Sequence, residues 1–281
     1  MRAQRFGGLK ENLPRSPRKG VRADRKDDDG AFVQEVLSQN GVDIANVSVT
    51  HEKTSFSEVM SVSGGQRTFF VYSGTNAQFG VEDVPLSNTD VKMLHLGYLL
   101  LLDKIDAGEG AILLKKAQDL GISTSIDLVS ENSDRYSLAL PCLQYTDNLI
   151  INESEAGKLT GIHPLKENIR VICEKLMEYG VRERVIVHCP EYGVCLSRNA
   201  YTVVPSYDLP DGFIQGTTGA GDAFCAGALY AVHEGWSNEA LLEFASAAAV
   251  AALSEVDATS GVKSEAEIQR LCANLNRRNI C

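Results

Sequence analysis

The stretch that decides the fold is Gly216-Thr217-Thr218-Gly219-Ala220-Gly221-Asp222-Ala223-Phe224. Its glycines permit backbone angles and close approaches that a Cβ would block, so consecutive N–H groups can point into one small volume. The residues that follow, up to 232, are apolar and helix-forming. They place the turn at a helix N-terminus, where an anion is favoured. The stretch therefore predicts a phosphate-binding turn before a long helix.

Asp222 is the unusual member of this stretch. A carboxylate in an anion site repels the ligand unless it has a task, such as accepting the proton of an attacking hydroxyl. The alternative is an N-capping aspartate on an ordinary buried helix, which is the commoner role of an isolated Gly-x-Gly-Asp. The full run of small residues before Asp222 favours the catalytic interpretation.

A second motif, Asn152-Glu153-Ser154-Glu155-Ala156, follows an apolar run that is typical of a buried strand. Amide and carboxylate oxygens near the carboxyl end of a strand suit Mg²⁺ held largely through water. An asparagine before two glutamates is also a helix N-cap with favourable first-turn charges. Asn152 and Glu155 are therefore both candidate metal residues and candidate cap residues.

Beyond residue 30 the hydrophobic pattern alternates between strand and helix. Strands are expected at 93–97, 122–126, 149–151 and 185–187, and helices at 32–37, 110–120, 136–143, 165–179, 220–234, 238–253 and 264–274. The alternation predicts a parallel sheet covered by helices, with ligands at the carboxyl ends of its strands. Asp127 follows one of these strands and is a candidate to orient a substrate, whereas His95 and Cys225 are expected to be core residues. Two further strands predict a β-hairpin at 56–72.

Composition narrows the class of protein. The chain has 281 residues, of which 44% are hydrophobic, enough for one large α/β domain. Seven cysteines without Cys-x-x-Cys spacing favour reduced thiols in a cytoplasmic compartment. No apolar run reaches the length of a membrane span.

Charge is distributed unevenly along the chain. Residues 1–26 sum to +7, which leaves −17 for the residues after them. A basic arm of this kind is found in nucleic-acid-binding segments and in organellar presequences, whereas the acidic remainder argues against a nucleic-acid enzyme. Pro14 and Pro17 oppose a helix in the basic segment. Residues 1–26 are therefore expected to be disordered or aberrant.

The residues from Thr217 to Phe224, followed by Ala226-Gly227, resemble the C-terminal signature of the ribokinase-like (PfkB) carbohydrate and nucleoside kinases. The Asn152 motif, followed by Leu159-Thr160-Gly161, is similar to the metal-associated motif of that family and precedes the glycine turn in the expected order. The resemblance implies a three-layer α/β/α sandwich with a mostly parallel central sheet. It also implies a small β lid, here the hairpin at 56–72, within a kinase domain at 27–281.

The resemblance assigns the chemistry of phosphate transfer to particular residues. Asp222 falls on the base that deprotonates the acceptor hydroxyl, and Gly219, Ala220 and Gly221 fall on the anion hole. ATP and Mg²⁺ are the implied cofactors, with Asn152 and Glu155 associated with the metal ion.

Nucleotide binding is assigned by the same resemblance to Thr218 and His188. Relatives commonly carry Thr-x-Gly where this chain has His188-Cys189-Pro190, and a proline there removes a backbone donor. In some relatives the region matching residues 257–261 holds a monovalent cation. In some the lid also forms a dimer interface, so the resemblance leaves a homodimer through the lid open.

The acceptor side of the resemblance is weaker. Gly74-Thr75-Asn76 is similar to a Gly-Ala-Asn segment near the substrate, which makes Asn76 a substrate-contact candidate. Gly7-Gly8-Leu9-Lys10-Glu11-Asn12 has the spacing of the family's sugar-binding motif, so Gly8 and Asn12 are candidates as an eroded remnant of it. The family's first strands are expected to be missing here, as a truncated or frame-shifted start would explain.

The leading hypothesis is an ATP-dependent phosphotransferase that acts on a hydroxyl of a sugar or sugar derivative. A nucleoside kinase of the adenosine kinase type is the first alternative. The second is a catalytically inactive ribokinase-like protein, because the missing strands would normally shape the acceptor pocket. Nothing in the sequence identifies the particular sugar or nucleoside.

Overall fold

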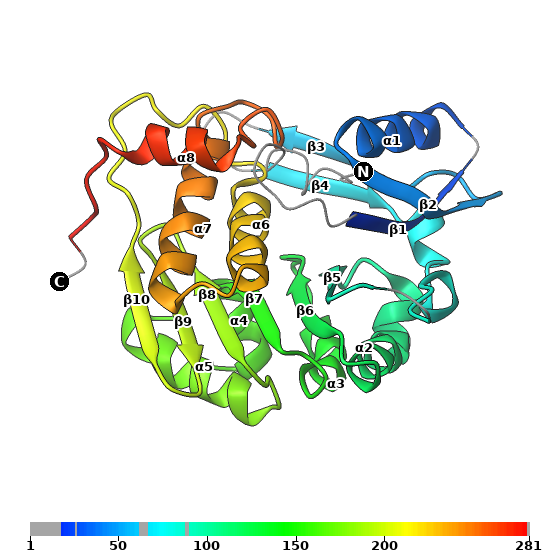
Figure 1. Ribbon diagram of the computed structural model, residues 1–281, viewed down its shortest axis with the longest axis horizontal. Coiled ribbons are helices and arrows are strands. Elements are labelled where there is room, and N and C mark those ends of the chain that lie inside the picture. The colour runs from blue at the N-terminus through cyan, green and yellow to red at the C-terminus, as the bar shows by residue number, and fades with distance from the viewer. Residues whose placement is uncertain (1–17, 26, 62–66, 88–89, 280–281) are drawn as a thin grey trace.

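A six-stranded sheet forms the centre of the computed structural model, which describes residues 18–25, 27–61, 67–87 and 90–279 (Figure 1). Its strands lie in the order β10-β9-β8-β7-β6-β5. Strands β5 to β8 are parallel, and β9 and β10 are antiparallel additions at one edge. The bounds are β5 Met93–Leu99, β6 Ser123–Leu128, β7 Asn148–Asn152, β8 Arg184–His188, β9 Tyr192–Ser197 and β10 Tyr201–Pro205.

Helices cover both faces of this sheet because its inner strands are apolar on both sides. In β7, Leu149 and Ile151 pack on one face and Ile150 on the other. The first face carries α2 Gly110–Asp119, α3 Leu140–Leu143, α4 Glu153–Thr160 and α5 Ile169–Glu178. The second carries α6 Ala220–His233 and α7 Asn238–Leu253, with α8 Glu265–Cys272 packed on α7. The three-layer sandwich predicted from the sequence is confirmed.

Helices α6 and α7 pack closely because small residues line their contact. A Cβ on Gly227 would lie 2.9 Å from Ala245 Cα, closer than real Cβ contacts allow. Short helical turns lie between these elements, at Gly74–Ala77, Val81–Asp83, Ile105–Glu109, Arg135–Ala139 and Lys166–Asn168. Within the described residues, no helix is both long and apolar enough to cross a membrane.

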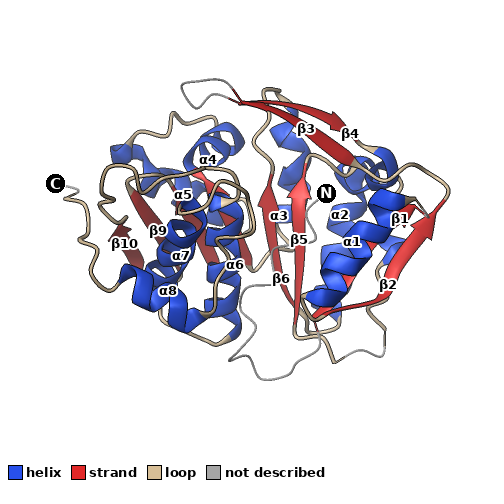
Figure 2. Ribbon diagram, turned by 90° about the horizontal axis from the view of Figure 1, so that it is seen from above, coloured by secondary structure: helices blue, strands red, loops and turns tan. Residues whose placement is uncertain are grey.

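The N-terminal region holds a strand that the sequence did not predict. Arg18–Arg25 form strand β1, within the segment expected to be disordered or aberrant. Strand β1 pairs in parallel with β2 (Val42–Thr50), and α1 (Asp28–Gln39) connects them, but this pair is a sheet of its own and adds no strand to the main sheet. Figures 1 and 2 place the unit on the β5 side of the main sheet. Gly8 and Asn12 lie outside the described residues.

The predicted hairpin is confirmed as β3 (Phe56–Ser61) and β4 (Arg67–Tyr72), an antiparallel pair separate from the main sheet (Figure 2). Successive strand residues point to opposite faces, so Phe69 and Phe70 lie on different faces of the hairpin. Both rings are about half exposed. The exposed apolar side chains of the hairpin are Val59, Met60, Phe69, Phe70, Val71 and Tyr72.

Candidate active site

The glycine turn stands at the N-terminus of α6, as the sequence predicts. Gly219 is the N-cap of the helix, with a φ of 87° that L side chains rarely adopt. A Cβ there would lie 2.6 Å from the carbonyl oxygen of Ala258, so both the conformation and the packing require glycine. The turn thus packs against the loop after α7 and presents the first N–H groups of α6, which favour an anion.

His188 lies beside this turn. A Cβ on Gly221 would lie 3.5 Å from His188 Cε1, and the imidazole ring is 4.6 Å from the ring of Phe224 in α6. The structure therefore brings His188, at the end of β8, to the turn where a phosphate would bind. Thr218 directly precedes Gly219 and is partly buried. The roles of His188 and Thr218 in nucleotide binding stay predictions.

Asp222 lies in the first turn of α6, where its partly buried carboxylate accepts a hydrogen bond from another element. The hydroxyl of Tyr98, at the end of β5, donates to Asp222 Oδ1 at 2.7 Å. A hydroxyl–carboxylate bond of this length is a strong, charge-assisted one. Asp222 is thus placed to accept a hydrogen bond from a hydroxyl, as a base toward an alcohol must be.

Tyr98 is the residue that sequence reasoning missed. It has a φ of 63°, which is uncommon for a residue other than glycine, and its N–H donates to Asp127 Oδ1. Leu100 also has a positive φ, of 80°, and its N–H donates to Asp106 Oδ1 at 2.8 Å. Burial raises the pKa of Asp106. No local pattern predicts such a turn, because the strand propensity of these residues suggests that β5 simply continues.

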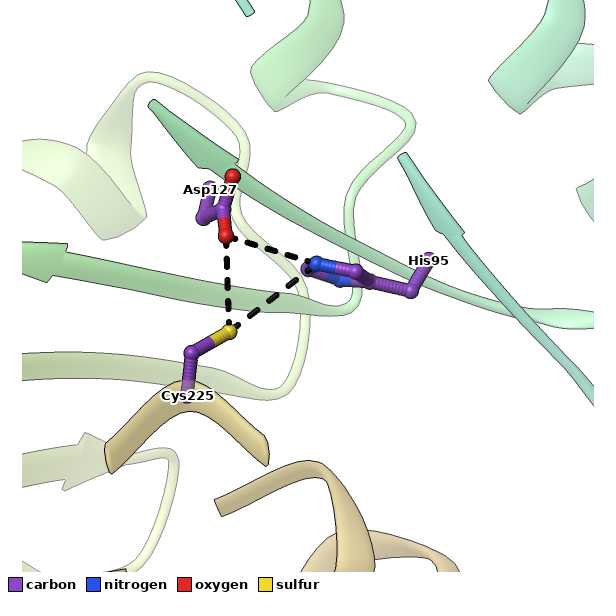
Figure 3. Close-up of side chains that lie close together, drawn as sticks. All are labelled: His95, Asp127 and Cys225. Atoms are coloured by element: carbon purple, nitrogen blue, oxygen red, sulfur yellow. Dashed lines mark hydrogen bonds and ion pairs between the residues drawn. The ribbon is translucent and has the colours of Figure 1, made fainter. Parts of the chain in front are cut away.

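Asp127 lies within β6 and is 4% exposed. Besides supporting Tyr98, it faces His95 and Cys225, with Oδ2 3.5 Å from His95 Nε2 and 3.5 Å from Cys225 Sγ (Figure 3). Asp127 is therefore linked to Asp222 through Tyr98. A direct contact between Asp127 and a substrate stays a prediction.

Asn152 and Glu155 form the capping box of α4. The Asn152 side chain accepts from the N–H of Glu155, and Glu155 Oε2 accepts from the N–H of Asn152. The Ser130 hydroxyl joins both side chains, accepting from Asn152 Nδ2 and donating to Glu155 Oε1, each at 2.8 Å. Burial raises the pKa of Glu155 to about 7. The helix-cap interpretation thus describes the local structure, and a metal-associated role stays a prediction.

The remaining candidates lie in two turns. The N–H of Asn76 donates to Ser55 Oγ at 2.9 Å, which fixes the 74–77 turn to the chain just before β3. In the loop after α7, the Ser260 hydroxyl donates to Asp257 Oδ2, and the N–H groups of Ser260 and Thr259 donate to Oδ1. These bonds, the one from the Ser260 hydroxyl above all, hold the pKa of Asp257 well below the ordinary value. Contact between Asn76 and an acceptor, and a monovalent cation at 257–261, stay predictions.

Known proteins share this fold and sequence pattern. The ribokinase of Arabidopsis thaliana is 29% identical over 230 residues, which are 80% of this chain and 59% of that protein. A 5-dehydro-2-deoxygluconokinase of Clostridium perfringens is 22% identical over 233 residues, which are 78% of this chain and 68% of that protein. The chain thus spans less than two thirds of the Arabidopsis relative.

Solved structures agree on the architecture. Arabidopsis ribokinase complexed with ribose and ATP matches with a TM-score of 0.74 and 24% identity, covering 91% of this chain and 81% of that one. A ribokinase II from E. coli in complex with ATP and Mg²⁺ matches with a TM-score of 0.76 and 20% identity, covering 96% and 84%. These likenesses establish the ribokinase-like fold. The sequence model of the pfkB family of carbohydrate kinases matches residues 26–265, and the chain therefore belongs to this family.

Proposed function

We propose that the protein transfers the γ-phosphoryl group of ATP to a hydroxyl of a sugar or sugar derivative. The observation that carries the proposal is the placement of Asp222 in the first turn of α6, directly after the Gly219–Gly221 turn. That arrangement sets a proton acceptor beside an anion-binding helix end. Family membership over most of the chain supports the same reaction.

In this reaction Asp222 takes the proton of the acceptor hydroxyl as the oxygen attacks phosphorus. The N–H groups of the Gly219–Gly221 turn hold the charge on the transferred group, and the positive end of α6 adds to their effect. Tyr98 holds the Asp222 carboxylate in one orientation through its hydroxyl. Positioning and electrostatics are the main protein contributions in phosphoryl transfer.

ATP and Mg²⁺ fit the residues present. The exposed Gly221 has no Cβ, so a phosphate can approach the backbone of the turn closely, and Thr218 and His188 lie beside this position. Bound Mg²⁺ neutralises phosphate charge. Both oxygens of Glu155 already accept hydrogen bonds, so Asn152 and Glu155 would hold the ion through water rather than directly. Two of the similar solved structures are complexes with ATP, and one of these also holds Mg²⁺.

The acceptor is inferred to be a pentose, a hexose or a keto-deoxy sugar acid. Two kinds of relative support this range, the Arabidopsis ribokinase and the Clostridium 5-dehydro-2-deoxygluconokinase. Asn76 and Asp127 are the candidates for acceptor binding. Their side chains would form hydrogen bonds with the hydroxyl groups of the sugar. We also infer a cytoplasmic location, which the reduced thiols of the described cysteines support.

The test measures ADP release with ATP, Mg²⁺ and a panel of pentoses, hexoses, keto-deoxy sugar acids and nucleosides. One sugar or sugar acid should be turned over, and Asp222→Asn should lower kcat by about 10²- to 10⁴-fold, the usual contribution of a general base. Full activity of Asp222→Asn would refute the base assignment. Turnover of a nucleoside alone would make the protein a nucleoside kinase, and nucleotide binding without turnover of any acceptor would make it an inactive relative.

We further infer a homodimer through the lid. Both faces of the hairpin expose aromatic rings. If the hairpin is a lid, the acceptor would cover one face and the hairpin of a second copy of the chain would cover the other. Light scattering of the protein should give the dimer mass. Phe69→Asp and Phe70→Asp alter opposite faces, so one should dissociate the dimer and the other should raise the acceptor KM. A monomer at micromolar concentration would refute the inference.

A further inference from the structure

Three metal-binding side chains converge next to the active site, each from a different element. His95 lies on β5, Asp127 on β6 and Cys225 on α6 (Figure 3). His95 Nε2 and Asp127 Oδ2 are 3.5 Å apart, Cys225 Sγ and Asp127 Oδ2 are 3.5 Å apart, and Cys225 Sγ and His95 Nε2 are 3.9 Å apart. All three side chains are at least nine-tenths buried.

These separations fit the edges of a metal-centred tetrahedron. Zinc bonds of about 2.0–2.3 Å at tetrahedral angles place neighbouring ligand atoms about 3.3–3.6 Å apart. Without an ion, the Cys225 thiol donates a long hydrogen bond to Asp127 Oδ2, and His95 Nε2 lies within ion-pair distance of the same oxygen. The cluster is thus spaced for an ion shared among its members, with only Cys225 and His95 needing to approach slightly.

The orientation of His95 supports the same conclusion. Its Nδ1 is 2.9 Å from Ser125 Oγ, and the Ser125 hydroxyl donates to the carbonyl oxygen of Leu94 at 3.4 Å. With its hydrogen directed there, Ser125 Oγ can accept from Nδ1–H, which leaves Nε2 as the ring atom that faces the cluster. Nε2 faces the Asp127 carboxylate at 3.5 Å, a contact that is an ion pair when the imidazole is protonated, and a metal ion bound to both atoms would take the place of that proton.

We propose that His95, Asp127 and Cys225 bind one Zn²⁺ ion. A thiolate and an imidazole select a borderline-soft ion, whereas Mg²⁺ takes oxygen ligands, so this site differs from the one proposed at Asn152 and Glu155. Binding releases the thiol proton of Cys225, and three protein ligands leave a fourth position for water. Gly97 borders the cluster, since a Cβ there would lie 3.2 Å from His95 Nε2. The glycine leaves that side of the cluster open.

The site adjoins the active site without depending on it. Cys225 follows Asp222 on α6, and Asp127 keeps Oδ1 on the N–H of Tyr98 while Oδ2 faces the ion position. Zn²⁺ binding needs neither ATP nor an acceptor. Failure of the zinc proposal and failure of the proposed kinase activity are therefore distinguishable.

Cobalt titration tests the site. The purified, chelator-treated chain is titrated with Co²⁺ and then with Zn²⁺. One Co²⁺ per chain should bind and give visible bands of a tetrahedral ion and a near-ultraviolet thiolate-to-cobalt band, both removed by Zn²⁺. Competition with a chromophoric chelator should then show that Cys225→Ser and His95→Asn weaken zinc binding by at least about 10-fold, as the loss of even a supporting residue does.

Cys173→Ala is the matched control, because Cys173 is a buried thiol on α5 in a different part of the core. It should leave the cobalt bands unchanged. Absence of the thiolate band in the unsubstituted protein would overturn the proposal, whether or not the variants fold. Persistence of that band in a folded Cys225→Ser variant would also overturn it, because another cysteine would then be the ligand.

Discussion

Removing the hydroxyl of Tyr98 should slow phosphoryl transfer while leaving acceptor binding almost unchanged. In Tyr98→Phe the ring stays and the 2.7 Å bond to Asp222 Oδ1 is lost. A hydrogen bond to a charged group contributes about 1.5–3 kcal/mol. If that energy orients the base in the transition state, kcat falls about 10- to 150-fold. The KM for the acceptor should change less than about 3-fold, since the lost bond is not to the substrate.

The assay is steady-state ADP release with the best acceptor, with kcat and both KM values determined separately. Tyr201→Phe is the matched control, because Tyr201 begins β10, at the opposite edge of the sheet from β5 and Tyr98. Its kinetics should match those of the unsubstituted enzyme. Melting temperatures of both variants check that a loss of rate is not a loss of folded protein.

A double-mutant cycle decides whether Tyr98 acts through Asp222. In an Asp222→Asn background, Tyr98→Phe should lower kcat by less than about 2-fold, because residues that act as a unit are not additive. An equal loss in both backgrounds would refute the positioning role. An unchanged kcat with a lower acceptor KM would instead mean that the tyrosine competes with the acceptor hydroxyl.

Three further substitutions probe the turn, the cap and the nucleotide side. Gly219→Ala should lower the free energy of unfolding by about 2–4 kcal/mol and raise the KM for ATP. Gly235→Ala is its control: with a φ of 69° and open space around the new Cβ, it should lower the free energy of unfolding by only about 1 kcal/mol. Asn152→Ala should lower the free energy of unfolding by about 1 kcal/mol and raise the Mg²⁺ concentration that gives half-maximal rate. Ser237 is the N-cap of α7, and Ser237→Ala should lower the stability alone. His188→Ala should raise the KM for ATP and leave that for the acceptor unchanged.

Sequence patterns predicted the buried inner strands of the main sheet and also the exposed β3–β4 hairpin. Strands β6, β7 and β8 were readable because their apolar runs are bounded by turns and alternate with amphipathic helices. The antiparallel strands β9 and β10 were not predicted, since residues after 188 resemble a nucleotide loop more than a strand. Strand β1 is rich in Arg and Lys, and a strand paired only with one neighbour needs no apolar run.

The candidate site likewise contains residues that the sequence predicted and residues that it did not. Gly219, Gly221 and Asp222 are contiguous, so local backbone requirements disclose them in the sequence. The cluster of His95, Asp127 and Cys225 joins residues far apart in the chain. His95 and Cys225 were expected to be core residues, and Asp127 was expected to orient a substrate. Its existence depends on how α6 lies over the ends of β5 and β6, which single-sequence patterns do not specify.

The strained backbone at the end of β5 positions the tyrosine that bonds to Asp222, the proposed base. Positive φ angles at residues other than glycine cost of order 1–3 kcal/mol each and persist only where the surroundings enforce them. Tyr98 and Leu100 are both in this state, and each N–H is held by a buried carboxylate, Asp127 and Asp106 respectively. The strain directs the Tyr98 hydroxyl onto Asp222, so the orientation of the base depends on β5 and β6 as well as on α6. A substitution at Asp127 would therefore act on catalysis through Tyr98 even if Asp127 never touched a substrate.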